Sequence, residues 1–267
     1  MLPRLIATDL DGTLLDPSGT LTARSAAALQ AAADLGVLVV FASGRPPFFA
    51  TREIEAAGRG VHYGVMANGT IICALPGGEV LHHVTFAAQL ARQAVVTLRA
   101  HDPGLRVALA TDRGFTAEEG FRGRMPIDPG GDAVADALVG HEDAVEAIKL
   151  FAFHPVLDAH ALLRELPVVL GADLAVGHMG ADAVEIAPAG ADKGRGLQWL
   201  CDHLGIEGSD VLVFGDEVND LPMFGFAGRS IAVGNANPTV REAADQVCEP
   251  NGDDGVARTI ERLLAEG

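Results

Sequence analysis

Residues 5–15, LIATDLDGTLL, decide the fold of this chain. The apolar run Leu5–Leu10 predicts a buried strand that ends at two carboxylates, Asp9 and Asp11, spaced two residues apart. Residues with this spacing share one face of an extended chain, so we expect both acids to face one space. Gly12 then lets the chain turn without strain. An Asp-Gly pair is also a common turn, but these two acids together can supply a nucleophile and a proton donor.

The same pattern of a buried strand followed by a polar, glycine-marked loop occurs twice more. Val37–Ala42 shows no polar alternation, which is typical of a strand buried on both faces of a parallel sheet, and it runs into Ser43-Gly44-Arg45. A third predicted strand, Tyr63–Ala67, ends at Asn68-Gly69. Helical stretches separate these strands, so the sequence predicts an α/β fold with a Rossmann-like parallel sheet.

The pattern changes between about Thr85 and Glu185, where the glycine-marked strand ends disappear. We expect a separate inserted α/β cap domain at residues 84–187, and a core made of residues 1–83 and 188–267. The candidate hinges are His82-His83 and Pro188-Ala189-Gly190. Within the insert, the sequence predicts helices at 92–101 and 158–166, and strands at 107–111, 148–153 and 183–186.

After the insert the first pattern resumes. Lys193–Leu204 reads as a helix stopped by Gly205, and Val211–Phe214 as a buried strand. That strand leads into an acidic loop, Gly215-Asp216-Glu217-Val218-Asn219-Asp220. The carboxyl ends of parallel strands meet at one edge of a sheet, so we expect this loop to face Asp9 and Asp11.

The expected gathering of carboxylates requires a positive charge. Two like charges about 4 Å apart repel by roughly 4 kcal/mol at an effective dielectric constant near 20. A divalent cation removes this repulsion, and oxygen ligands favour Mg²⁺. The simpler interpretation of the second cluster is a solvated acidic loop, which is less favoured because both clusters follow buried strands.

Ser43, Gly44 and Lys193 complement the acids. A phosphoryl group in transfer needs cations and hydrogen-bond donors directed at its oxygens. Ser43 and Gly44, at a predicted helix entrance, offer a hydroxyl and backbone N–H groups, and Lys193 opens a helix. Each of these features alone is more often an ordinary surface feature. Their combination with two acidic clusters favours a site for phosphate chemistry.

Composition excludes several other functions. The formal net charge of −17 over 267 residues repels nucleic-acid backbones, so we expect no nucleic-acid partner. The longest apolar run is too short to cross a membrane, and the start of the chain shows no signal-peptide pattern. Three scattered cysteines indicate a reducing compartment without zinc spacing. We therefore expect a cytoplasmic protein; its oligomeric state is not readable.

Four motifs resemble those of the haloacid dehalogenase-like (HAD) phosphohydrolases. They are Asp9-Leu10-Asp11-Gly12-Thr13, Ser43-Gly44-Arg45, Lys193-Gly194 and Gly215-Asp216-x-x-Asn219-Asp220. Their order, with a long insert between the second and third, resembles the Cof-type subgroup with its α/β cap. Further similarities to that subgroup are Asn68-Gly69, Gly234-Asn235-Ala236 and Asn251-Gly252-x-x-Gly255-Val256.

The resemblance implies a role for each matched residue. Asp9 would attack phosphorus and form an aspartyl-phosphate. Asp11 would act as proton donor and then as base, which requires a raised pKa that nearby carboxylates and burial can supply. Mg²⁺ would be held by Asp9, the backbone carbonyl of Asp11 and Asp216, with Asp220 as a further metal-site residue. The implied phosphate and substrate contacts are Ser43, Gly44, Arg45, Asn68, Lys193 and Asn219. Glu217 departs from the family pattern, which places the charge of the metal site in question.

We therefore predict a Mg²⁺-dependent phosphatase of small phosphorylated metabolites, with sugar phosphates first. The alternatives are a sugar phosphomutase on the same fold and a receiver-like protein that is phosphorylated on Asp9 as a signal. Asp11 and the long insert disfavour the receiver. Specificity is expected to lie in the cap, where Glu185 and His178 are the positions of interest.

Overall fold

The computed structural model describes the whole chain except residues 1, 85, 112–113, 119–146, 179–182 and 267. It divides into two compact units, one formed by Met1–His83 with Asp192–Gly267 and the other by Val84–Ala191. We call them the core unit and the inserted unit and describe each separately. No helix in the described part of the chain is long and apolar enough to span a membrane.

The core unit is built on one sheet with the strand order β13-β12-β11-β1-β2-β3-β4-β5. The strands from β13 to β3 run parallel, and β4 and β5 are added antiparallel at one edge. The strand bounds are β1 Leu5–Thr8, β2 Leu38–Ala42, β3 Tyr63–Met66, β4 Ile71–Ala74, β5 Val80–His83, β11 Val211–Gly215, β12 Arg229–Ala232 and β13 Gln246–Val247.

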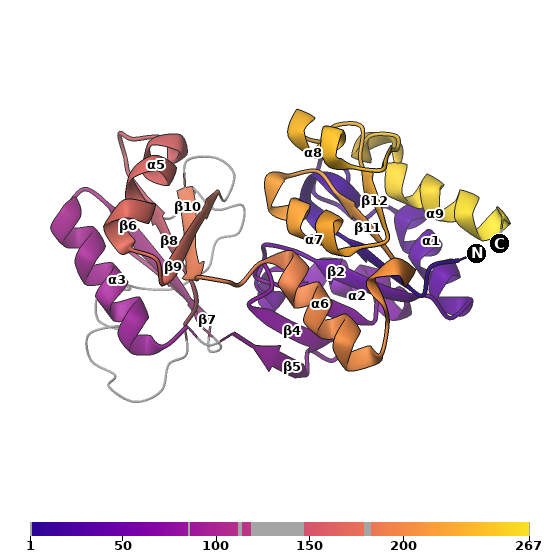
Figure 1. Cartoon of the computed structure of the whole chain (residues 1–267), viewed down its shortest axis with the longest axis horizontal. Coiled ribbons are helices and arrows are strands. Elements are labelled where there is room, and N and C mark those ends of the chain that lie inside the picture. Colours follow the sequence, from indigo (N-terminus) through magenta and orange to yellow (C-terminus); the bar gives the residue numbers. More distant parts are fainter. Residues whose placement is uncertain (1, 85, 112–113, 119–146, 179–182, 267) are drawn as a thin grey trace. The chain divides into compact units, whose positions relative to one another are not determined.

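Helices pack on this sheet in two groups, as expected for a Rossmann-like fold. Helices α1 and α9 lie against each other, and α6 and α7 form a second pair, seen in orange side by side in Figure 1. The helix bounds are α1 Ala23–Asp34, α2 Thr51–Ala57, α6 Lys193–Leu204, α7 Leu221–Phe226, α8 Pro238–Ala243 and α9 Gly255–Glu266. The predicted α/β fold with a parallel sheet is confirmed.

The central strands are buried along their full length, which explains the absence of polar alternation in their sequences. Every residue of β1 and of β11 is buried, and the two strands pair in parallel with Leu5 opposite Val211. β2 pairs with the other side of β1 in the same direction. The loops that follow β1, β2 and β11 therefore begin at the same edge of the sheet.

Local capping places the start of α6. The Asp192 carboxylate accepts a hydrogen bond from the Arg195 N–H at 2.8 Å, so Asp192 is the N-cap and Lys193 the first helical residue. Gly205 ends the helix in a left-handed conformation with φ +63°. The predicted helix Lys193–Leu204 therefore matches the observed one, and it puts the lysine at the edge that carries the strand-end loops.

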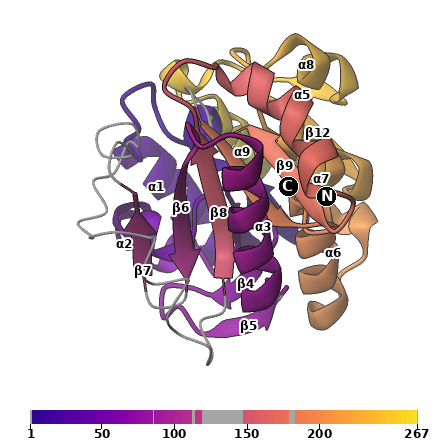
Figure 2. The same ribbon diagram turned by 90° about the vertical axis from the view of Figure 1, so that its left-hand side faces the viewer.

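The inserted unit contains a second sheet with the order β7-β6-β8-β10-β9, and all of its strand pairs are antiparallel. Helices α3 and α5 contact each other, and Figure 2 shows α3 running alongside β6 and β8. The bounds are α3 Ala88–His101, β6 Arg106–Thr111, β7 Gly114–Ala117, β8 Ala147–Phe153, α5 Ala159–Leu170, β9 Leu174–His178 and β10 Ala183–Pro188.

The sequence missed short or edge strands and placed the candidate hinges inside regular structure. His82 and His83 belong to β5 and pair with β4, while Pro188 is the last residue of β10. The strands β4, β5, β7 and β9 were not predicted. Three of them, β5, β7 and β9, lie at the edges of their sheets, where a strand need not carry the continuous apolar run that marks β1, β2 and β11.

We predict that the core unit folds without the inserted unit, because it has its own sheet and its own two helical groups. A variant in which a short Gly-Ser linker replaces residues 84–191 should unfold cooperatively by circular dichroism. Trp199, the one tryptophan in the sequence, stacks on His82 with ring centroids 4.5 Å apart and reports the core unit by fluorescence. A gradual transition with solvent-exposed tryptophan emission at all temperatures would contradict this prediction.

Candidate active site

The chain leaves β1 earlier than the apolar run predicted, and the two acids of the first motif differ in exposure. The strand ends at Thr8, and residues 10–15 form a wide turn closed by the Leu15 N–H on the Leu10 carbonyl at 2.9 Å. Asp9 is 5% exposed, whereas the side chain of Asp11 is 54% exposed. The two acids therefore differ in exposure, and the expectation that both face one space stays a prediction.

Three carboxylates from two strand ends converge beside β1. Oxygen atoms of Asp9, Asp216 and Asp220 all lie within 4.8 Å of one another. Lys193 lies between two of them, and its Nζ donates to Asp9 Oδ1 and to Asp220 Oδ1, each at 2.6 Å. The lysine is 1% exposed and Asp220 is fully buried. The first and last motifs of the sequence therefore meet at one site, and we call these four residues the acidic cluster.

Neighbouring groups hold the acidic cluster in place. The other carboxylate oxygen of Asp220 accepts the backbone N–H groups of Asp216 at 2.9 Å and Glu217 at 3.0 Å. The Thr13 hydroxyl donates to Asp216 Oδ1 at 2.6 Å. Because Asp220 bonds to the lysine through one oxygen and to the backbone through the other, it fixes Lys193 and the loop that carries Asp216.

Glu217 lies outside the acidic cluster. Its side chain is exposed and accepts a hydrogen bond from the Val218 N–H at 3.4 Å, as the N-cap of the short helix Val218–Asp220. The departure from the family pattern is therefore a helix cap.

Two asparagines from the C-terminal loops lock the turn that follows Asp9. Asn235 Nδ2 donates to the Gly12 carbonyl and Asn251 Nδ2 to the Leu15 carbonyl, both at 2.8 Å. The Asn251 N–H in turn donates to Asn235 Oδ1 at 2.9 Å. Both asparagines fall in motifs to which the sequence analysis gave no role. The structure shows that their side chains hydrogen-bond to the backbone of the turn after Asp9.

Burial governs the protonation of the acidic cluster. It raises the pKa of the Asp9 carboxyl well above the usual range, with Lys193 opposing and the charges of Asp220 and Asp216 adding to the rise. Burial also raises the pKa of Asp216 to about 6, although the hydrogen bond from Thr13 opposes it. For Lys193 burial lowers the pKa, but the charges of Asp220 and Asp9 outweigh it and raise the pKa above the ordinary value. The lysine is therefore a fixed cation.

The donor set of the acidic cluster fits a hard divalent cation. Three carboxylates against one ammonium leave two negative charges without a counter-charge, and the neighbouring carboxylates add to the rise that burial causes in the pKa of Asp9 and of Asp216. Carboxylate oxygens are the ligands that Mg²⁺ prefers. Of the three, Asp9 and Asp216 are the better-suited ligands, because both oxygens of Asp220 already accept protein donors.

Asp11 is paired with an arginine outside the acidic cluster. Arg45 Nε donates to Asp11 Oδ2 at 2.7 Å and Arg45 Nη2 donates to Asp11 Oδ1, which gives a bidentate pair. The sequence analysis expected burial and neighbouring carboxylates to act on Asp11. That expectation is wrong, because the side chain is half exposed and its bonded neighbour is a cation.

The other predicted phosphate-binding residues lie on the loops after β2 and β3. The buried Ser43 hydroxyl accepts a hydrogen bond from the Arg45 N–H at 3.1 Å, and the Asn68 N–H donates to the Ser43 carbonyl at 3.0 Å. A Cβ on Gly44 would meet the Asn68 side chain at 3.3 Å. Asn219 Nδ2 donates to Asn68 Oδ1 at 3.2 Å. The two asparagines therefore link the β3 loop to the loop that carries Asp216.

The inserted unit contains a buried ion pair, and the sequence analysis named one of its two residues. Lys149 on β8 is fully buried, and its Nζ donates to Glu185 Oε2 on β10 at 2.7 Å. Glu185 was singled out from the sequence, but Lys149 was not, because it lies in an otherwise apolar strand. The side chain of His178 lies outside the described residues.

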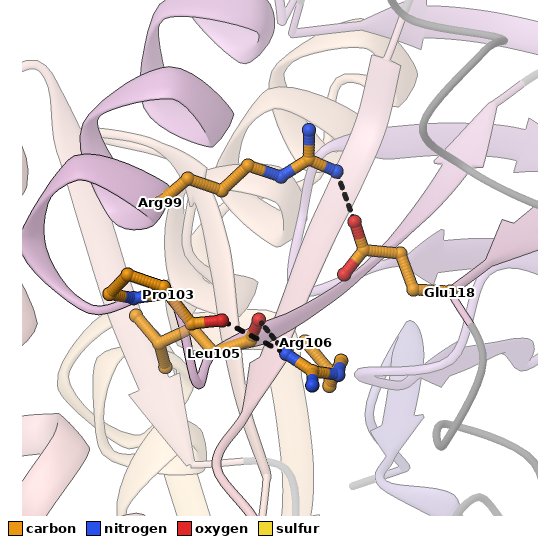
Figure 3. A pocket seen from close by; sticks show the side chains of 5 residues that line it. All are labelled: Arg99, Pro103, Leu105, Arg106 and Glu118. Atoms are coloured by element: carbon orange, nitrogen blue, oxygen red, sulfur yellow. Dashed lines mark hydrogen bonds and ion pairs between the residues drawn. The ribbon is translucent and has the colours of Figure 1, made fainter.

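A separate cavity of about 370 Å³ in the inserted unit is lined by Arg99, Pro103, Leu105, Arg106 and Glu118 (Figure 3). Its two guanidinium groups already have partners. Arg99 pairs with Glu118, and Arg106 Nη1 donates to the carbonyls of Pro103 at 3.1 Å and Leu105 at 3.0 Å. We assign no ligand to this cavity.

Comparisons with known proteins identify a matching family and several relatives. The family described as haloacid dehalogenase-like hydrolase matches residues 6–260. The HMP-PP phosphatase of Cronobacter sakazakii is 32% identical over 89% of this chain and 86% of that protein. The 5-amino-6-(5-phospho-D-ribitylamino)uracil phosphatase of Bacillus subtilis is 28% identical over 98% of both chains. A haloacid dehalogenase-like hydrolase from Bacteroides thetaiotaomicron superimposes with a TM-score of 0.81 at 26% identity, over 98% of this chain and 99% of that one.

The chain belongs to the haloacid dehalogenase-like hydrolases. The resemblance stated from the four motifs is confirmed, as is the predicted fold class of a Rossmann-like core with an inserted α/β domain. The predicted enzyme class, a phosphoric monoester hydrolase, is confirmed as well.

We predict that Gly12→Ala disables the site through Asp216. Gly12 has φ +83°, and an added Cβ would collide with the Asp216 carboxylate. The positive φ alone should lower the free energy of unfolding by about 1–2 kcal/mol. The collision should in addition abolish most phosphatase activity, measured as phosphate release from an aryl phosphate.

The matched control is Gly19→Ala, which has a similar φ of +77° and nothing within 4 Å of the added Cβ. It should lose similar stability by denaturant unfolding and keep its activity. Equal activities of the two variants would show that the close approach to Asp216 is unimportant.

Proposed function

We propose that this protein is a Mg²⁺-dependent phosphatase of small phosphorylated metabolites, sugar phosphates first, that acts through an aspartyl-phosphate. One observation carries the proposal. The buried Lys193 ammonium bonds to Asp9 and Asp220 beside Asp216, which gives a carboxylate nucleophile, a fixed cation and a set of metal ligands at one strand edge.

In the proposed first step, an Asp9 carboxylate oxygen attacks the phosphorus atom and the bond from phosphorus to the leaving oxygen breaks. Asp11 gives its proton to that oxygen, so the alcohol departs neutral. In the second step, Asp11 takes a proton from water, and the resulting hydroxide attacks phosphorus. The bond between phosphorus and the Asp9 oxygen breaks, which releases phosphate and regenerates the Asp9 carboxylate. The exposure of Asp11 supports its access to both the leaving group and water.

Several residues of the core unit would bind the phosphoryl oxygens. We assign this role to the Ser43 hydroxyl and the Gly44 N–H after β2, and to the Lys193 ammonium. Arg45, Asn68 and Asn219 complete the proposed substrate contacts, with the two asparagines joined by a hydrogen bond. These groups offer the donors and positive charge that phosphoryl transfer requires.

The proposed Mg²⁺ would be held by the carboxylates of Asp9 and Asp216 and by the Asp11 backbone carbonyl, with Asp220 in support. When bound, it supplies positive charge that offsets the developing charge on the phosphoryl oxygens. Asp220 positions Lys193 through one oxygen and the Asp216 loop through the other.

The small-metabolite assignment is supported by the names of the relatives, both of which describe phosphatases of small phosphorylated molecules. The phospho-ribityl group in the name of the Bacillus subtilis relative favours a phosphorylated sugar-like chain. A phosphomutase would return the phosphoryl group to a second hydroxyl of the substrate. Release of inorganic phosphate in amounts equal to the substrate consumed distinguishes the two activities.

We predict that activity depends on Mg²⁺ and that Mg²⁺ binding weakens in acid. EDTA should abolish phosphate release from an aryl phosphate, and added Mg²⁺ should restore it. With a pKa of about 6, Asp216 is ionised at about pH 7.5 and largely protonated at about pH 5, where protons compete with the cation. The rise in Tm on adding Mg²⁺ should therefore be clearly larger at the higher pH.

The direction of this pH dependence follows from the raised pKa of Asp216. In the metal-free protein, Asp216 contributes stability below its ordinary value of 3.8 and loses it as the pH rises through about 6. The cation restores that loss. Asp216→Asn should abolish the Mg²⁺-dependent rise, whereas Asp202→Asn, an exposed position on α6, should keep it. Full activity in a chelated sample would refute the metal requirement.

We predict that replacing Asp9 and replacing Asp11 block the reaction at different steps. Asp9→Asn removes the nucleophile, so turnover should fall to background. Asp11→Asn removes the proton donor and base, which commonly contribute about 10²–10⁴-fold each. The first step should lose least with an aryl phosphate, whose leaving group needs little protonation. The second step still needs Asp11 to activate water, whatever the leaving group was. The phosphoryl-enzyme should therefore accumulate in Asp11→Asn and be detected by intact mass.

A covalent phosphoryl adduct at position 9 of the Asp9→Asn protein would overturn the assignment of the nucleophile. Wild-type turnover in Asp11→Asn would overturn the assignment of the acid and base.

A further inference from the structure

Arg45, the partner of Asp11, is itself held by a second carboxylate that lies outside all four motifs. Glu53 on α2 is 8% exposed, and its Oε1 accepts a hydrogen bond from Arg45 Nη1 at 3.2 Å. The same Nη1 donates to the Phe49 carbonyl at 3.3 Å. The guanidinium therefore lies between two carboxylates, one buried on a helix and one exposed at the site.

The two carboxylates use different edges of the guanidinium. Asp11 takes the edge formed by Nε and Nη2, and Glu53 with the Phe49 carbonyl takes Nη1. A guanidinium is planar and rigid, so fixing Nη1 also fixes the direction of the opposite edge. The backbone of Arg45 is fixed as well, by its N–H on Ser43 Oγ and by its carbonyl, which accepts the Ala67 N–H at 2.9 Å.

We propose that Glu53 is a positioning residue for the phosphatase reaction and acts on Asp11 through Arg45. The inference rests on the proposed function, because it concerns the residue assigned there as acid and base. Among the described residues, the hydrogen bonds of the half-exposed Asp11 side chain come from Arg45. Its orientation toward the leaving oxygen and water therefore depends on how firmly the arginine is held.

If Glu53 acts through Arg45, the effect of loosening the arginine should depend on the leaving group of the substrate. Misplacement of a catalytic group by about 1 Å can cost about 100-fold in rate. An alkyl phosphate needs the proton from Asp11 in the first step, whereas an aryl phosphate does not. Loosening Arg45 should therefore slow alkyl phosphate turnover much more than formation of the phosphoryl-enzyme from an aryl phosphate.

The test is Glu53→Met, which keeps the length of the side chain and removes the charged acceptor. We expect kcat for an alkyl phosphate to fall about 10- to 100-fold, with KM changed less than about threefold. The burst of aryl alcohol from an aryl phosphate should change less than about threefold. Glu53→Gln retains an acceptor oxygen for Nη1 and should recover part of the loss.

The matched control is Glu55→Met, an exposed glutamate two residues further along the same helix, which should behave as the wild type. In an Arg45→Gln background, Glu53→Met should cause no additional loss, because residues that act through one another are not additive. If Glu53→Met fails to fold, Glu53→Gln tests the same link, since it keeps the size of the side chain and removes its charge. It should show a smaller loss with the same leaving-group selectivity.

Wild-type rates for alkyl phosphates in Glu53→Met would overturn the proposal. So would a loss in the aryl burst equal to the loss in kcat for the alkyl phosphate, or additive losses in the Arg45→Gln background. If the proposed function itself is wrong, the same measurements give a different result. In that case the wild-type protein releases no phosphate from either substrate, or Asp11→Asn shows no dependence on the leaving group.

Discussion

The buried ammonium of Lys193 is the interaction on which the rest of the site depends. An ion removed from water loses several kcal/mol of solvation after relaxation, and only close, well-aligned partners offset that loss. Lys193 has two such partners, Asp9 and Asp220, at 2.6 Å each. Removing either carboxylate would take away one of the two hydrogen-bonded partners that offset the lost solvation of the lysine. The three residues therefore constrain where β1, α6 and the loop after β11 lie relative to one another.

Close packing around α6 helps to fix the position of Lys193. A Cβ on Gly194 would collide with the Pro222 backbone of α7, and one on Gly196 would meet Val65 at 2.7 Å. Both glycines let the first turn of α6 approach its neighbours, and Asp192 caps that turn. The lysine thereby reaches the strand edge from a rigid helix. A rigid support of this kind suits a catalytic cation, because its orientation is set before the substrate binds.

The two acids of the first motif show how environment divides chemical roles. Asp9 is buried against a cation and other carboxylates, while Asp11 lies at the surface against Arg45. Two residues apart in sequence, they differ in exposure, in bonded partner and in freedom of movement. This difference suits one residue to covalent attack and the other to proton transfer with a leaving group and water.

The sequence by itself determined the buried parallel strands, the start and end of α6, the convergence of the loops after β1 and β11, and the family. These follow from local signals, namely apolar runs, an N-cap aspartate, a glycine stop and motifs in a set order. Only the tertiary structure decided that Asp11 pairs with Arg45, that Glu53 also accepts a hydrogen bond from that arginine, and that Lys149 pairs with Glu185. Pairing between residues far apart depends on backbone directions at Gly12 and on the packing of helices, and no local pattern in the chain encodes either.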